Sequence, residues 1–183
     1  AASDVYKRQN ENFVKYNSLD NAKNNGISFV SGDRKKEGIL PNLSIYENLV
    51  VPLYKKTSRA GFLGFIDLLE LNGIFDWEVD RLSIKTGPRD NLIGSLSGGN
   101  QQKVMIARSF AQHPKVLILN DPARGIDVST KRYLYVHLRN YVEEGNTVVF
   151  LSSELEEFIG LCPKVMVFRL SNLLDSSNSF VPR

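Results

Sequence analysis

The feature that most constrains the fold is one continuous stretch from Leu96 to Asp127. It opens with Leu-Ser-Gly-Gly-Asn-Gln-Gln-Lys at 96–103, continues in a helical pattern up to Pro114, and then becomes an apolar run at 116–119. A glycine-rich turn therefore leads into a helix, and the helix leads into a buried strand with polar residues after it. This order of elements predicts an α/β fold with a parallel sheet.

The turn at the start of the stretch predicts an anion site. Ser97 can cap the helix, and Gly98 and Gly99 allow a ligand to approach the backbone closely. The unpaired N–H groups of the first helical turn would face that ligand, with the positive end of the helix dipole behind them, and phosphate is the usual anion in such places. A Ser-Gly-Gly turn also starts helices that bind nothing, and these three residues alone do not decide between the two.

The stretch also resembles a known family. Residues 96–103 resemble the signature motif of the ATP-binding-cassette (ABC) ATPases, in the form typical of bacterial importers of simple sugars such as ribose, galactose or xylose. Residues 116–121 stand where that family has its Walker B strand, and residues 124–127 are similar to its D-loop. The resemblance implies an α/β, P-loop NTPase-like parallel sheet with an inserted helical subdomain.

Further elements are predicted on both sides of this stretch from apolar periodicity. The predicted strands are 27–31, 147–152 and 164–168, and the predicted helices are 45–51, 61–71, 128–144 and 153–159. Ser44 and Glu47 form a capping box at the first of these helices, and Gly145 is placed to end the third. The apolar stripe on 61–71, which comprises Phe62, Phe65, Ile66, Leu69 and optionally Leu68, is interpreted as core in preference to a partner groove. The segment around Trp77 receives no element.

The family pattern divides the chain into three parts. Residues 21–170 resemble the C-terminal part of the second nucleotide-binding domain of a sugar importer, with the helical subdomain at about 44–112. Residues 1–20 are polar and match nothing that we recognise, so they are expected to be disordered or non-native. Residues 171–183 are rich in Ser and Asn and are expected to be a frayed tail.

The phosphate cradle of the family is not found in these 183 residues. A Walker A run, Gly-x-x-x-x-Gly-Lys-Ser/Thr after a strand, does not occur. In the family this run would lie upstream of residue 21. We therefore expect the chain to be the later portion of a cassette, without the N-terminal strands and the P-loop.

Four positions that the resemblance places at the cassette's own catalytic site carry altered residues. Asn120 stands at the Walker B aspartate, Asp121 at the catalytic glutamate, Ser153 at the switch histidine and Gly32 at the Q-loop residue near the metal. A neutral amide binds a hard cation less well than a carboxylate does, and aspartate is one methylene shorter than glutamate. Ser153 could instead serve only as a helix cap. We expect this site to be weak or inactive.

The signature, by contrast, is intact. In the family, cassettes pair head to tail, and each signature caps the nucleotide on the other cassette's P-loop. The resemblance therefore implies that this chain contributes to a partner's ATP site, with Mg²⁺ present in the full assembly. The residues implied in nucleotide binding are Leu96, Ser97, Gly98, Gly99, Asn100, Gln101 and Asp127.

Composition limits the partners. A formal net charge of +3 does not indicate nucleic acid, and the short run Arg34-Lys35-Lys36 is typical of a solvated loop. No apolar run approaches the roughly 20 residues that span a bilayer. The resemblance implies a second nucleotide-binding domain and transmembrane permease subunits as partners, and indirectly a periplasmic sugar-binding protein. It implies a peripheral location at the cytoplasmic face of the inner (cell) membrane.

Four functions are compatible with the signature. The leading hypothesis is the ATP-binding and ATP-hydrolysing subunit of a sugar importer, and the first alternative is a regulatory or structural cassette that does not hydrolyse ATP. A DNA-repair-type ABC ATPase is disfavoured because the segment between Ser31 and Leu96 contains no sustained heptad pattern. A cassette acting on ribosomes is disfavoured by the sugar-importer form of the signature.

Overall fold

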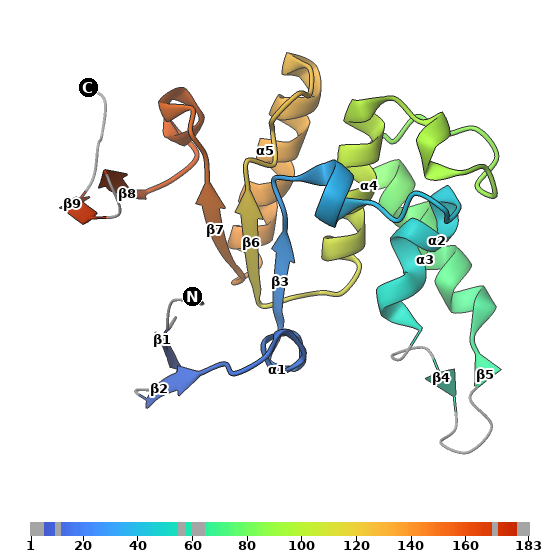
Figure 1. The fold of residues 1–183 in the computed structure, drawn as a ribbon, viewed down its shortest axis with the longest axis horizontal. Coiled ribbons are helices and arrows are strands. Elements are labelled where there is room, and N and C mark those ends of the chain that lie inside the picture. Colours follow the sequence, from blue (N-terminus) through green and yellow to red (C-terminus); the bar gives the residue numbers. More distant parts are fainter. Residues whose placement is uncertain (1–5, 10–11, 55–57, 60–64, 170–171, 179–183) are drawn as a thin grey trace.

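The computed structural model describes residues 6–9, 12–54, 58–59, 65–169 and 172–178. At its centre lies a three-stranded parallel sheet in the order β3 (Ile27–Val30), β6 (Val116–Asn120) and β7 (Thr147–Leu151), as Figure 1 shows. The register aligns the carboxyl ends of these strands, which therefore lie at one edge of the sheet. The predicted α/β fold with a parallel sheet is confirmed.

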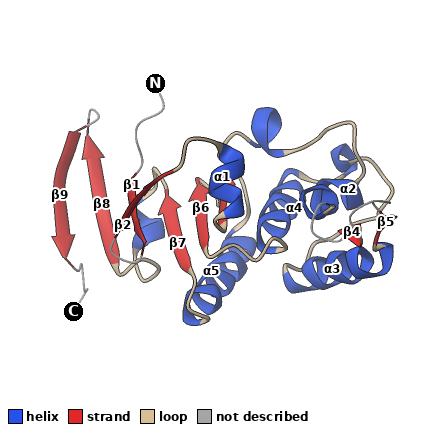
Figure 2. Ribbon diagram, turned by 90° about the horizontal axis from the view of Figure 1, so that it is seen from below, coloured by secondary structure: helices blue, strands red, loops and turns tan. Residues whose placement is uncertain are grey.

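Helices pack on one face of this sheet. Helix α4 (Gly98–Phe110) precedes β6, and α5 (Val128–Glu143) links β6 to β7 and lies along the sheet in Figure 2. The side chains on that face are buried, including Val30, Leu117 and Leu119. The face that points the other way is half open, since Phe29 is 53% exposed and Val149 is 42% exposed. Parallel sheets usually have both faces covered, so this surface is unusual.

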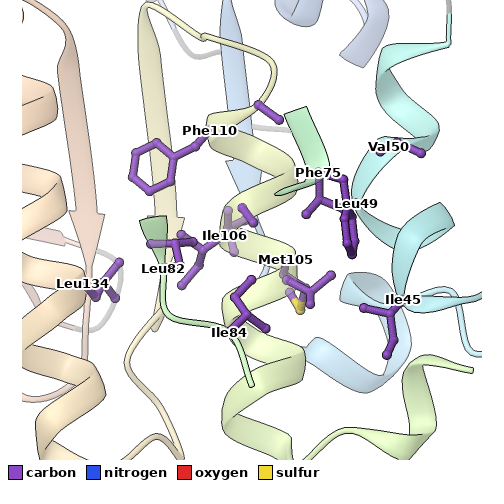
Figure 3. Close-up of a cluster of buried hydrophobic side chains, with 14 of the residues drawn as sticks. Ile45, Leu49, Val50, Phe75, Leu82, Ile84, Met105, Ile106, Phe110 and Leu134 are labelled. Carbon is purple, nitrogen blue, oxygen red and sulfur yellow. The ribbon is translucent and has the colours of Figure 1, made fainter. Parts of the chain in front are cut away.

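Three helices form a second packed region beside the sheet. Helix α2 (Ile45–Val50) begins at the predicted capping box and runs into the short helix η2 (Val51–Leu53). It packs with α3 (Leu68–Arg81) and α4 around the apolar cluster of Figure 3. Leu49, Phe75 and Met105 supply this cluster from α2, α3 and α4 in turn. Burial of such side chains stabilises the folded chain by about 1.5–3 kcal/mol each.

The helix predicted over 61–71 is placed wrongly. Residues 65–66 form the strand β5 (Phe65–Ile66), which pairs with β4 (Ser58–Arg59), and α3 begins only at Leu68. Asp67 explains this start, because its carboxylate accepts a hydrogen bond from the Glu70 amide at 3.0 Å and caps the helix. The part of the prediction that falls on residues 61–64, including Phe62, lies outside the described residues.

The buried face of α3 also differs from the predicted stripe. Leu68 and Leu69 are exposed, whereas Leu71, Phe75 and Glu78 are buried. The helix continues through Trp77 to Arg81, across the segment that received no element. Because Phe65 and Ile66 lie in β5 and outside the helix, the buried face is formed by Leu71, Phe75 and Glu78, whose spacing of four and three residues follows the helical period.

Regular structure occurs at both ends of the chain, where none was predicted for residues 1–20 and 171–183. Strands β1 (Tyr6–Gln9) and β2 (Asn12–Lys15) form one antiparallel pair, and Ser18 then caps α1 (Leu19–Asn24). Strand β8 (Lys164–Arg169) pairs with β9 (Asn172–Asn178), so the predicted strand at 164–168 lies outside the parallel sheet. Two antiparallel strands can be joined by a short connection, and they pair through hydrogen bonds between backbone N–H and C=O groups. Such pairs can therefore form in segments whose side chains show no strand pattern.

The remaining elements are short. They are η1 (Arg34–Gly38) after β3, η3 (Ile93–Ser95) before the signature turn, and η4 (Leu155–Phe158) after β7. Gly145 has φ of +89° two residues beyond the end of α5, which confirms it as the predicted C-terminal glycine. Within the described ranges, no helix combines the length and apolar character needed to cross a membrane.

Candidate functional site

The signature turn adopts the predicted capped conformation. Helix α4 begins at Gly98, and Ser97 Oγ accepts hydrogen bonds from the Asn100 amide at 3.4 Å and from Asn100 Nδ2 at 3.1 Å. Gln101 Nε2 donates to the Leu96 carbonyl at 3.0 Å and closes the turn from the other side. A side chain at Gly99 would meet only Ile126, at 3.8 Å, so the backbone there is open to a ligand.

A hollow of about 380 Å³ lies in front of this turn. It contains four of the predicted nucleotide-binding residues, Ser97, Gly99, Asn100 and Asp127. The others, Leu96, Gly98 and Gln101, belong to the same turn without lining the hollow. Residues that we did not predict complete its wall: Ser83, Lys85, Lys103, Ser129, Thr130 and Tyr133. These residues come from three separate segments. Only Lys103 belongs to the signature motif, so it is the one residue of this group that the sequence pattern could have identified.

Two lysines give the hollow a positive character. Lys103 Nζ donates to the Ser83 carbonyl at 2.9 Å, and the Lys85 amide donates to Asn100 Oδ1 at 3.1 Å. Burial lowers the pKa of Lys103, while the nearby Asp127 carboxylate opposes this effect. The segment that joins α3 to the signature is thereby fastened to α4, with Lys85 beside Asn100 and Ser97.

Asp127 has a structural task in this hollow. Its carboxylate accepts hydrogen bonds from the Thr130 amide at 2.9 Å and from the Thr130 hydroxyl at 2.8 Å, and so caps α5. The Ser129 hydroxyl also donates to it. These donors, the Ser129 hydroxyl first, hold the pKa of Asp127 well below its usual range. The carboxylate is therefore a fixed negative charge next to two lysines.

The four altered positions meet at the carboxyl edge of the sheet. A side chain at Gly32 would lie 3.2 Å from Asn120 Nδ2, so these two residues are neighbours. Asp121 has φ of +44°, its amide donates to the Leu151 carbonyl at 2.8 Å, and its Oδ1 accepts from the Ser153 amide at 3.1 Å. We name the group formed by Gly32, Asn120, Asp121 and Ser153 the sheet-edge site.

Ser153 caps no helix in the structure. The predicted helix from Ser153 through Ile159 is wrong, because only the short η4 forms and it starts at Leu155, with no side-chain cap hydrogen bond. The Ser152 hydroxyl instead donates to Glu157 Oε2 at 2.6 Å. Lys131 of α5 donates to Glu157 at 2.8 Å and to Glu154 at 3.0 Å. Burial raises the pKa of Glu157, but these hydrogen bonds outweigh it and the net shift is downward.

The sheet-edge site does not fit a magnesium ion. Gly32 offers no side-chain ligand, Asn120 offers a neutral amide, and the Asp121 carboxylate accepts a hydrogen bond from Ser153. Across the described ranges, no three or more His, Cys, Asp or Glu side chains gather where they could hold a metal. Since Mg²⁺ favours carboxylate oxygens in octahedral geometry, we assign no metal-dependent step to these residues.

Comparison with known proteins identifies a family whose model matches this chain. The family model described as "ABC transporter" matches residues 7–124, which cover β3, the three-helix region, the signature turn and β6. The match begins inside the segment 1–20 that we expected to be non-native.

Curated relatives have consistent names. The ribose import ATP-binding protein RbsA of Roseobacter denitrificans is 38% identical over 81% of this chain and 28% of its own length. The proteins of the same name from Bacillus cereus and Clostridium perfringens are 39% and 35% identical, over 84% and 86% of this chain. In each of those two the match spans 31% of the relative, so the chain corresponds to less than a third of the relatives' length.

Solved structures share the fold. The ATP-binding cassette MJ0796, in a dimeric post-hydrolysis state with ADP and Pi, superposes with a TM-score of 0.75 over 90% of this chain and 70% of that chain. A second dimeric structure of the same cassette gives the same TM-score. At 21% identity these likenesses concern the fold alone.

Proposed function

This chain belongs to the ABC transporter family, and on that premise we propose that it is part of the ATP-binding and ATP-hydrolysing subunit of a bacterial importer of simple sugars. The observation that carries the proposal is the signature turn at the start of α4, which retains its cap, its glycines and an open, lysine-lined hollow. The names of the relatives support the importer, since several are ribose import ATP-binding proteins.

The signature turn acts on a nucleotide that a partner cassette holds. The Ser97 hydroxyl and the amides of Gly98 and Gly99 bind the terminal phosphate, and Lys85 and Lys103 keep the potential positive around it. ATP supplies the phosphoanhydride bond whose cleavage drives transport. This chain's residues orient the phosphate and stabilise the charge that develops on it, which is the main protein contribution to phosphoryl transfer.

The residues of the sheet-edge site occupy the family's catalytic positions but do not catalyse ATP hydrolysis. Asn120 and Gly32 provide no charged ligand, and Asp121 reaches Ser153 where the family has a glutamate and a histidine. Turnover therefore takes place at the composite site formed by this signature and the partner's P-loop. In the assembly that site holds Mg-ATP, and the partner supplies the metal ligands.

The partners follow from this arrangement. They are a second nucleotide-binding domain, the transmembrane permease subunits and, indirectly, a periplasmic sugar-binding protein; no nucleic acid takes part. The protein is a peripheral subunit at the cytoplasmic face of the inner membrane.

A second candidate is a regulatory cassette that closes on a partner's ATP without promoting hydrolysis. The carboxylate-poor sheet-edge site favours it, because such a cassette needs no catalytic site of its own. Both candidates require the signature turn to engage the partner's nucleotide.

Association with a partner tests the proposal. The chain is mixed with a P-loop-competent cassette from a ribose importer, and complex formation is measured by sedimentation with Mg-ATP, with Mg-ADP and without nucleotide. We expect association that depends on ATP, with accelerated hydrolysis for the leading function and without it for the regulatory one. Association independent of nucleotide, or none in any condition, contradicts both.

A further inference from the structure

The charged loop after β3 lies against the signature helix, although it is far away in the sequence. Arg34 Nη1 donates a hydrogen bond of 2.7 Å to the carbonyl of Gly98, across 64 residues. Of the run Arg34-Lys35-Lys36, the two lysines are exposed as expected for a solvated loop, whereas Arg34 is half-buried. The prediction of a solvated loop is therefore wrong for Arg34 alone.

The same loop is fastened to α4 a second time. At the end of η1, the Gly38 carbonyl accepts a hydrogen bond from Arg108, and the Met105 side chain packs directly against Gly38. Inside the loop, Asp33 accepts from the Lys36 amide at 3.1 Å. The loop and the helix thus form one unit, with Arg34 at the end of α4 that faces the nucleotide hollow.

The close approach of Arg34 is favoured by a glycine in the signature. A Cβ at position 98 would lie 3.0 Å from Arg34 Nη2 and 3.1 Å from Nη1, so a side chain there would push the guanidinium back by a few tenths of an ångström. The first glycine of the signature therefore has two functions here. It opens the backbone to a ligand, and it lets an arginine from another segment reach the helix end.

The position of Arg34 is electrostatically unfavourable in the absence of an anion. A cation at a helix N-terminus faces the positive end of the dipole. In the part of the chain that the structure describes, no carboxylate pairs with Arg34, and its Nε is buried without a hydrogen-bond partner. An anion at the signature turn would offset both costs, because it would neutralise the dipole and the guanidinium together.

We infer that Arg34 is a positioning residue of the signature turn, which it holds through the Gly98 carbonyl so that the first amides of α4 face the terminal phosphate of the partner's nucleotide. This inference rests on the proposed function. The guanidinium stays on the carbonyl side of Gly98, and binding of the phosphate is left to the amides. Arg34 consequently favours a nucleoside triphosphate over a diphosphate, since only the triphosphate has a γ-phosphate to place at the turn.

The test compares Arg34→Met, Arg34→Lys and the matched control Lys35→Met, which removes the same charge from an exposed neighbour. The first measurement is sedimentation of the chain with the P-loop-competent cassette in Mg-ATP and in Mg-ADP. We expect Arg34→Met to weaken ATP-dependent association about 10- to 100-fold, the usual effect of losing a hydrogen bond to a charged group, and to reduce the preference for ATP over ADP. Lys35→Met should remain within about 2-fold of the parental chain.

The ATP preference separates positioning from mere fastening of the loop. A purely structural role would weaken association with ATP and with ADP in the same proportion, and that result overturns the inference. Arg34→Lys keeps the charge but lacks the planar fork, so it should lie between the parental chain and Arg34→Met. If Arg34→Met does not fold, Arg34→Lys carries the same comparison, and a parental ATP preference in it overturns the inference.

A second measurement is independent of the partner. Amide hydrogen exchange at Gln101 and Gln102, near the start of α4, should be faster in Arg34→Met than in Lys35→Met. If the parental chain shows no ATP-dependent association, the proposed function fails, and this measurement alone decides whether Arg34 holds the turn. Equal exchange in the two variants overturns the inference.

Discussion

The signature turn and the sheet-edge site were both located from one family pattern, yet they differ in what they retain. At the signature turn, residues from three segments converge, the Lys85 amide donates to Asn100, and Lys103 donates to the Ser83 carbonyl. At the sheet-edge site the backbone is equally well defined, but the residues offer an amide and a carboxylate that is already engaged. Position in a fold is thus preserved by the main chain, whereas chemistry depends on the side chains placed there.

The largest expected effect comes from blocking the signature turn. Ser97→Arg puts bulk and positive charge where we propose that the phosphate meets the backbone amides. ATP hydrolysis by the complex with the P-loop-competent cassette should fall at least about 10²–10³-fold, the usual effect of losing one preorganised donor. Ser95→Arg is the matched control, because Ser95 is exposed and lies outside the hollow. Equal rates of ATP hydrolysis for Ser97→Arg and Ser95→Arg would show that the signature turn is no more important for the reaction than its surroundings.

A smaller effect concerns the helices that support the signature. Glu78 of α3 is buried, and burial raises its pKa to about 7 although Arg81 lies 3.3 Å away. The folded state then binds a proton that the unfolded state has released, so this group's contribution to stability falls as pH rises from about 4.5 to 7. Replacement by glutamine should remove up to about 3 kcal/mol of this dependence. Chemical denaturation of the parental chain and Glu78→Gln across this pH range measures it, and parallel curves contradict it.

The ion pair of Lys131 and Glu157, which is hydrogen-bonded to Ser152 next to the sheet-edge site, should matter for stability more than for binding. Lys131→Met leaves the nearly buried Glu157 without its cation, at a cost of about 1–3 kcal/mol in the free energy of unfolding. ATP-dependent association with the partner cassette should change little, because the signature turn is untouched. Lys164→Met at the start of β8, where the side chain is exposed, provides the control for removal of a surface lysine. If Lys131→Met reduced the free energy of association by more than the free energy of unfolding, the ion pair and the signature turn would be directly coupled.

The smallest effect is expected from restoring the family residues at the sheet-edge site. The double variant Asn120→Asp, Asp121→Glu adds one carboxylate and lengthens the side chain of the other by one methylene, but it provides no phosphate cradle. Mg²⁺-dependent ATP hydrolysis by the chain alone should therefore stay at background, within about 3-fold of the parental value. Robust turnover by the double variant would show that the sheet edge needs only these two residues.

The sequence correctly predicted those elements that depend on interactions between residues close together in the chain. The Ser97 cap, the capping box of Ser44 and Glu47, and the strands at β3, β6 and β7 each depend on residues a few positions apart. Such motifs form wherever their residues occur, so their presence in the structure follows from the sequence.

Tertiary contacts decided the rest. The pairing of β5 with β4, which takes Phe65 and Ile66 out of the predicted helix, is revealed by no periodicity. The hollow gains Lys85 from a segment with no recognisable motif, and Arg34 reaches Gly98 across 64 residues. The strand β9 forms in a Ser/Asn-rich segment because an antiparallel ladder uses backbone groups. These features require the fold to be known.

Nucleotide affinity tests the central claim most directly, namely that this chain works on a partner's ATP and not on its own. Mg-ATP is titrated by calorimetry into the chain alone, into the P-loop-competent cassette alone, and into their mixture. We predict no tight binding by the chain, and tighter binding by the mixture than by the partner cassette alone, because ATP stabilises the closed complex. Micromolar affinity of the isolated chain for Mg-ATP, or identical affinities of the mixture and the partner, would contradict the account.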